Sequence, residues 1–71
     1  VAHLVGVYEN MKPKEAARIF TEMNPNFAAG FLSRMRSDAA AGILAKMDAE
    51  AAYAVTVVMA GRHVGGRGPV E

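Results

Sequence analysis

Residues 11–58 read MKPKEAARIFTE (11–22), MNPNFAAGFLSR (23–34), MRSDAAAGILAK (35–46) and MDAEAAYAVTVV (47–58) when the chain is divided into blocks of twelve. Each block begins with methionine, and Met59 follows the last block at the same interval. The sixth residue of every block is alanine, the ninth is apolar, and the tenth is apolar in all but the last. Self-similarity at a fixed period is typical of a repeat architecture.

The apolar positions of each block fall on one face of an α-helix. When the methionine of a block is counted as position 1, positions 6, 9, 10 and 13 are spaced i, i+3, i+4, i+7, and position 13 is the methionine of the next block. Leu4, Val7 and Tyr8 fill positions 6, 9 and 10 of a preceding block, which lacks its start. The predicted core faces are Ala16, Ile19, Phe20 and Met23, then Ala28, Phe31, Leu32 and Met35, and then Ala40, Ile43, Leu44 and Met47.

Helix start signals lie between these faces. Pro13 and Pro25 suit the first helical turn, and Asn24, Ser37 and Asp48 are favourable N-caps. The sequence therefore predicts an all-α fold, a compact superhelix of five short helices at about residues 2–11, 13–23, 25–35, 38–47 and 49–60. Because helices of this length are marginal alone, each must pack on its neighbours within one domain, residues 1–60. The hand of the superhelix stays open.

Residues 61–71, GRHVGGRGPVE, differ from the repeats in composition. Gly61 is a candidate helix stop, and the remaining glycines and the proline predict a flexible tail. His63 has no other ligand type at metal-binding spacing, so we expect a solvated side chain and no metal site.

Composition excludes several classes of protein. A chain of 71 residues has no room for two lobes around a cleft, and its net charge of +1 gives no basic excess for nucleic acid. The absence of cysteine excludes disulfides, a cysteine zinc site and a thiol nucleophile. No signal peptide and no apolar run of about 18 residues occurs, so membrane insertion is not expected of this fragment, which begins at Val1.

The sequence offers no catalytic constellation. Ser33 and Ser37 are the only serines and have no histidine near them in sequence, since His3 and His63 lie at opposite ends of the chain. The carboxylates look like caps and solvated faces. We therefore expect a non-enzymatic protein without a cofactor.

The last helix carries apolar residues outside the repeat's own face. Tyr53 and Val57 are i, i+4 neighbours, Val58 follows them, and Phe27 stands outside its own stripe at position 5. One interpretation makes these four residues a surface that binds a partner protein or a second copy. The other is that terminal helices simply pack in an atypical way.

The segment 11–61 resembles a known family. The stretches MKPKEAARIFTEM, AAGFLSRMRSDAAAGILAKMD and MAGRH are similar to the intracellular N-domain of MgtE-type magnesium transporters and to its armadillo-like relatives, which include parts of the flagellar switch protein FliG. The alanine-rich text is most similar to the MotE-type motility proteins of alphaproteobacteria. The resemblance implies stacked short helices and a protein-binding domain.

What the resemblance implies about function divides in two. A MotE-like protein would be periplasmic, would form a homodimer, and would bind or chaperone the motility protein MotC. The alternative is the magnesium-sensing regulatory N-domain of an MgtE-type transporter, which would be cytoplasmic. The acids of this chain are few and spread out, unlike those of the magnesium sensor.

Overall fold

Five helices make up most of the structure, a computed structural model that describes residues 2–64 and the side chains of residues 2–61. They are α1 (Ala2–Asn10), α2 (Pro13–Glu22), α3 (Pro25–Ser33), α4 (Ser37–Lys46) and α5 (Ala49–Val64). No strand occurs between residues 2 and 64. The predicted all-α fold of five short helices is confirmed, and the predicted helix limits agree with the structure to within two residues except at the end of α5.

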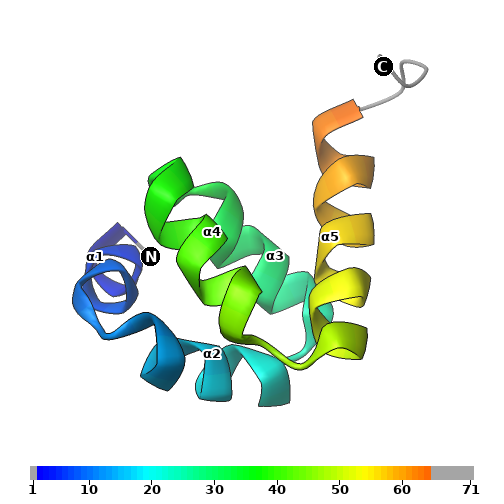
Figure 1. Cartoon of the computed structure of the whole chain (residues 1–71). Coiled ribbons are helices and arrows are strands. Elements are labelled where there is room, and N and C mark those ends of the chain that lie inside the picture. Colours follow the sequence, from blue (N-terminus) through cyan, green and yellow to red (C-terminus); the bar gives the residue numbers. More distant parts are fainter. Residues whose placement is uncertain (1, 65–71) are drawn as a thin grey trace.

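The main packing contacts join helices that are two places apart along the chain. α2 packs against α4, and α3 packs against α5. Figure 1 shows the result: α2 lies beneath α4 in the view, α3 lies beside α5, and α1 flanks the other end. The molecule measures 35 × 25 × 20 Å along its principal axes. The stack is therefore built from contacts between residues about two repeats apart.

The turns between helices repeat as faithfully as the sequence does. At each of the first four methionines the backbone N–H donates to the carbonyl oxygen three residues earlier, with an N···O distance of 3.2 Å. The residues that follow, Lys12, Asn24 and Arg36, have extended backbones with ψ between 131° and 143°. Pro13 and Pro25 favour this conformation, because a proline disfavours helical geometry in the residue before it.

Two of the three predicted N-caps are confirmed. The Asn24 Oδ1 accepts from the backbone N–H of Asn26 at 2.8 Å, and the Asp48 Oδ2 accepts from that of Ala51 at 3.2 Å. The prediction for Ser37 is wrong, because Ser37 is already the first helical residue and Arg36 is the N-cap without a side-chain bond. The Arg36 N–H instead donates to the Glu9 Oε2 of α1 at 2.8 Å.

A second cap of this cross-helix kind occurs one repeat later. The backbone N–H of Asp48 donates to the Thr21 Oγ1 of α2 at 3.3 Å. Glu9 and Thr21 both occupy position 11, and Arg36 and Asp48 both occupy position 2, 27 residues further on. Position 11 of α1 and of α2 therefore caps the turn that leads into the helix three places later.

The core is apolar throughout the described residues. Its largest fully buried side chains are Phe20, Leu32, Ile43 and Val55, and no polar side chain is buried. The Tyr8 ring meets Phe20 and Phe31 edge-on, with centroids 4.8 Å and 5.5 Å away, which attaches α1 to α2 and α3. The position-6 alanines Ala16, Ala28 and Ala40 are buried, as close helix crossings require.

Burial at positions 7 and 10 shows which side of a helix faces the next one in the stack. In α2 and α3 these positions are buried: Ala17, Phe20, Ala29 and Leu32. In α4 and α5, on which no described helix stacks, Ala41, Tyr53 and Thr56 are exposed and Leu44 is half-buried. Positions 7 and 10 therefore face the helix two places later.

Position 9 follows the opposite trend. Ile43 in α4 is 2% exposed and Val55 in α5 is buried, whereas Ile19 in α2 is 41% exposed. Position 9 faces the helix two places earlier, and no described helix stands two places before α2. The prediction that Ile19 belongs to the core is therefore wrong, although the same position is core in α4 and α5.

The last helix continues beyond the point where its predecessors turn. α5 has 16 residues and passes through Met59 and Gly61 to Val64, so the predicted helix stop at Gly61 is wrong. After Met59 the chain reads Ala-Gly, with no proline and no capping side chain to break the helix as at the earlier turns. Residues 61–64 of the predicted tail are helical, and the rest of that prediction, residues 65–71, lies outside the described residues, as does the His63 side chain.

Candidate functional site

Two of the four predicted partner-binding residues form one exposed patch. Tyr53 and Val57 are 72% and 52% exposed and lie one turn apart on the same side of α5. The hydroxyl of the neighbouring Thr56 donates to the Ala52 carbonyl of the same helix at 2.8 Å. The two exposed side chains thus give this side of α5 an apolar surface that is open to solvent.

The other two predicted residues lie elsewhere. Val58 is half-buried and packs against the core cluster, so it supports α5 from within. Phe27 is 69% exposed, but it lies in the first turns of α3. The ring contacts of the described residues join Tyr8, Phe20 and Phe31 and do not include Phe27 or Tyr53. The structure thus gathers Tyr53 and Val57 and leaves Phe27 as a separate exposed side chain.

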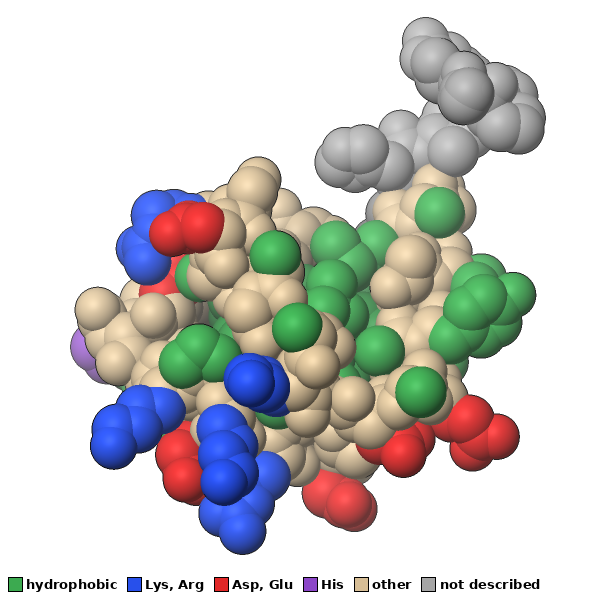
Figure 2. All heavy atoms as spheres, viewed as in Figure 1, with side chains coloured by type: hydrophobic (Ala, Val, Ile, Leu, Met, Phe, Trp, Pro, Cys, Tyr) green, Lys and Arg blue, Asp and Glu red, His purple; other side chains and the backbone are tan. Residues whose placement is uncertain are grey.

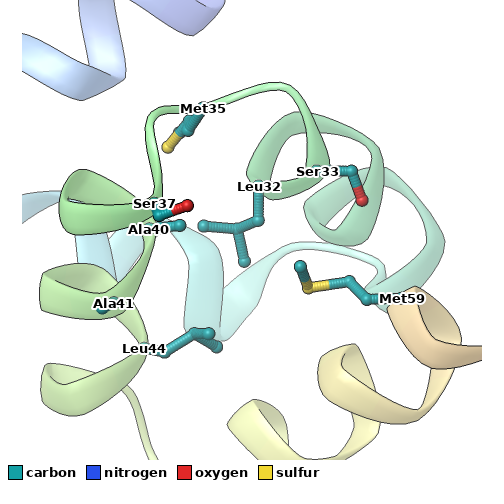
Figure 3. Close-up of a pocket in the computed structure, with 8 residues that line it drawn as sticks. All are labelled: Leu32, Ser33, Met35, Ser37, Ala40, Ala41, Leu44 and Met59. Carbon is teal, nitrogen blue, oxygen red and sulfur yellow. The ribbon is translucent and has the colours of Figure 1, made fainter. Parts of the chain in front are cut away.

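Sequence reasoning missed a groove between α4 and the C-terminal half of α5. Its volume is about 330 Å³. Its walls, drawn in Figure 3, are Leu32 and Ser33 of α3, Met35, Ser37, Ala40, Ala41 and Leu44 of α4 and the turn before it, and Met59 of α5. Met59 points from α5 toward Leu32, so the thioether forms part of the wall facing α4.

A second hollow of about 270 Å³ adjoins the first and shares Leu44 and Met59 with it. Thr56 and Ala60 complete its lining. Figure 2 shows hydrophobic side chains gathered in the recess between the body of the molecule and the projecting half of α5. Groove, hollow and the Tyr53–Val57 patch lie at the same end of the stack, and we call them together the C-terminal face.

The repeat explains why no described helix covers this face. Ala41 and Leu44 occupy positions 7 and 10 of α4, which in α2 and α3 are covered by the helix two places later. A helix stacked on α4 would fill the groove as α4 covers α2. The groove is therefore the unfilled next place in the stack.

Ser33 supports the same interpretation. It occupies position 11, where Glu9 and Thr21 accept the backbone N–H at the start of a stacked helix. Position 2 of the corresponding later block is Ala60, which lies inside α5 and begins no helix. The exposed Ser33 hydroxyl thus lines the groove as an acceptor without a helix start to cap.

The groove has a neutral, mainly apolar lining. None of its lining residues is charged, and its polar side chains are the two serines. Within residues 2–61 no group of three or more His, Asp or Glu side chains could hold a metal ion. No lining residue takes part in the ion pairs between described side chains, Arg18–Glu15, Arg36–Glu9 and Arg36–Asp38, although Arg36 and Asp38 flank Ser37 in sequence. Such a surface suits an apolar helix and not an ionic ligand.

The described helices also lack a membrane span. The longest, α5, has 16 residues, and none of those described is both long and apolar enough to cross a bilayer.

Comparison with known proteins identifies the family. Searches of the curated proteins and of the solved structures gave no match. A family model described as the MgtE intracellular N domain matches residues 2–60, which include most of all five helices. The predicted family is confirmed at this level, and the narrower likeness to MotE or FliG has no relative to support it. With its dodecad repeat, its stacked helices and this match, the chain belongs to the MgtE intracellular N-domain family.

Proposed function

We propose that this chain is a non-enzymatic docking domain that binds a partner protein at the C-terminal face of its helical stack. The observation that supports the proposal is the apolar groove between α4 and α5, together with the exposed Tyr53 and Val57 beside it. Contiguous exposed apolar surface marks interaction sites in soluble domains, because its burial is favourable. The family is named for one domain of a transporter, and a domain of that kind is consistent with a role in contacting other domains or proteins.

The chemistry of the groove favours docking over catalysis. Ser33 and Ser37 are the nucleophile candidates there, and the lining contains no His, Asp or Glu that could serve as their base. A serine hydroxyl without a base is a weak nucleophile at neutral pH.

Magnesium sensing is the second candidate, and the family match favours it. The described residues contain no group of three or more His, Asp or Glu side chains that could hold a metal ion. Binding of Mg²⁺ to this chain would therefore rest on one or two carboxylates and the waters that the ion retains. We therefore place docking first.

A magnesium titration separates the two candidates. Binding to the native state raises stability by mass action, so a sensing domain should melt at a higher temperature in millimolar Mg²⁺ than in millimolar Ca²⁺ or Na⁺ at equal ionic strength. A docking domain should show the same melting temperature in all three. A selective rise with Mg²⁺ would move the magnesium proposal to first place.

The MotE-like role is the narrower form of the docking proposal, with the periplasmic motility protein MotC as partner. It rests on the resemblance of residues 11–61 to MotE-type proteins. Binding of purified MotC to the chain, measured by calorimetry, tests it. Without such binding the MotE-like role falls, while docking to another partner stands.

One pair of variants tests the docking face itself. Val57→Asp places a carboxylate on the C-terminal face, and Val7→Asp places the same group at the opposite end of the stack, where Val7 is likewise exposed. We expect Val57→Asp to abolish binding of a different protein and Val7→Asp to leave that binding intact, with both variants folded by circular dichroism. Equal binding by both variants would reject the C-terminal face.

A further inference from the structure

The end of the stack opposite the C-terminal face is also incomplete. Val7 of α1 and Ile19 of α2 occupy position 9, which faces the helix two places earlier, and both are exposed. We call Gly6, Val7, Arg18 and Ile19 the N-terminal face. In α4 and α5, position 9 is covered by the helix two places earlier. The described residues contain no helix in that place for α1 or α2.

Gly6 points to a missing neighbour at this end. It occupies position 8, as does Gly42 in α4, where an added Cβ would lie 3.5 Å from Pro13 of the helix two places earlier. Position 8 is thus where a stacked helix approaches the start of the helix before it. A Cβ at Gly6 would meet nothing within 4 Å, although glycine is unfavourable inside a helix. Nothing in the described fold of one copy accounts for a glycine there.

The two end faces are complementary because the same repeat builds both. Inside the chain, position 10 of one helix meets position 9 of the helix two places later, as Tyr8 meets Phe31. The C-terminal face offers Leu44 and Thr56 at position 10, and the N-terminal face offers Val7 and Ile19 at position 9. Position 3 of one helix likewise meets position 8 of the other, as Pro13 meets Gly42.

We infer that a second copy of this chain is the partner of the C-terminal face, with its α1 lying in the groove on α4 and its α2 lying on α5. In this arrangement Gly6 of the second copy lies over Ser37, a residue of the groove wall. Val7 packs on Leu44, and Ile19 packs on Thr56. The contact continues the internal stacking interface from one molecule to the next.

Charge supports this register. Position 8 of α2 is Arg18, which is exposed and pairs with Glu15 on its own helix at 3.1 Å. The register places Arg18 of the second copy over Ala49, which stands between the exposed Asp48 and Glu50 at the start of α5. A cation there is opposite two carboxylates, and a shift by one repeat would lose this pairing.

The contact is heterologous, because the two copies use different faces. A bound pair of copies leaves one N-terminal and one C-terminal face free, so association continues into chains or closes into a ring. The inference deepens the proposed docking function, since it names the partner of the same face.

Complementation between two variants tests the head-to-tail contact. Gly6→Gln should block the N-terminal face, and Ala41→Arg should block the groove. Both changes should leave the fold of one copy intact, because a Cβ at Gly6 meets nothing within 4 Å and Ala41 is exposed. In sedimentation from about 10 µM to about 1 mM, where weak interfaces associate, the unmodified chain should grow beyond a dimer. Each variant alone should associate at least about tenfold more weakly. Their equimolar mixture should form a heterodimer and nothing larger.

Three results would overturn the inference: a chain that stays monomeric at the highest concentration, association that survives in both variants, or a mixture that stays monomeric. The first would leave the groove to a helix of another protein. Ile19→Glu and Thr56→Arg, both at exposed positions, form a second pair if either first variant fails to fold. Phe27→Ser is the control, because the exposed ring that it removes belongs to neither the N-terminal nor the C-terminal face.

Failure of this inference is distinguishable from failure of the docking function. Val7→Asp should abolish self-association and leave binding of a different partner intact. Loss of self-association alone would therefore leave the docking proposal standing, and Val57→Asp would test that proposal separately.

Discussion

Ile19 and Ile43 are the same amino acid at the same position of two repeats, and their surroundings differ because of what lies two helices earlier. α2 stands in that place for α4 and covers Ile43, which is 2% exposed. No described helix stands in that place for α2, and Ile19 is 41% exposed. Burial at this position is thus decided by the place of a repeat in the stack and not by its residue type.

The same substitution, Ile→Val, at these two positions should show whether stability depends on the burial of the residue or on its type. Ile43→Val removes a buried methyl group and should lower the free energy of unfolding by about 1 kcal/mol. Ile19→Val removes the same group from the surface and should change it by less than about 0.5 kcal/mol. Urea unfolding followed by circular dichroism measures both. Equal losses would mean that Ile19 is buried in solution.

Residue-scale prediction from sequence succeeded where the signal is local. Asn24 and Asp48 cap their helices as predicted, because an N-cap bond spans only two or three residues. Ser37 was predicted to cap by the same rule, but the helix begins one residue earlier, with Arg36 as the N-cap, and Glu9, 27 residues away, accepts the Arg36 N–H. A partner at that separation leaves no local pattern in the sequence.

At the scale of single helices, position 11 of α1 and of α2 caps the start of the helix three places later. Thr21→Val keeps the shape of the side chain and removes the acceptor of the Asp48 N–H, which should cost about 1 kcal/mol of unfolding free energy. Exchange of the Asp48 amide should also become faster. Ser33→Ala, at the same position but without a helix start to cap, is the control and should have little effect. Unchanged stability in Thr21→Val would mean that water replaces the bond.

The length of α5 gives a second expectation at this scale. Gly61 lies inside α5, and a Cβ there would meet nothing within 4 Å. Gly61→Ala should therefore raise the helical signal at 222 nm and stabilise the end of α5 by about 0.5–1 kcal/mol. If Gly61 ended the helix in a left-handed conformation, the same change would lower stability.

At the scale of the whole molecule, the core joins helices that are not neighbours in sequence. α3 packs on α5, and Ala29 and Leu32 of α3 are buried. A chain ending at Asp48 lacks α5, so both residues would be exposed. We expect such a chain to lose most of its helical signal and its cooperative melting, because isolated helices of this length are marginal. Four helices that melted cooperatively without α5 would contradict this view.

The sequence predicted the helices and the composition of the core but only part of the candidate site. Tyr53 and Val57 could be predicted as exposed because they depart from the repeat. Val58 departs from it too and is half-buried, since burial on a terminal helix depends on its neighbours. The groove could not be predicted, because Ala41 and Leu44 obey the repeat and are uncovered only by their place in the stack.

Stacking between alternate helices also constrains synthesis on the ribosome. When α2 leaves the exit tunnel, the helix that covers Ala17 and Phe20 has not yet been made, and α3 likewise waits for α5. The nascent chain must carry its alanine-rich and aromatic surfaces unprotected until about two dozen further residues have emerged. The hydrophobic core is thus completed only when the final helix has emerged. Until then, a chaperone that shields nascent chains could bind the exposed apolar surfaces.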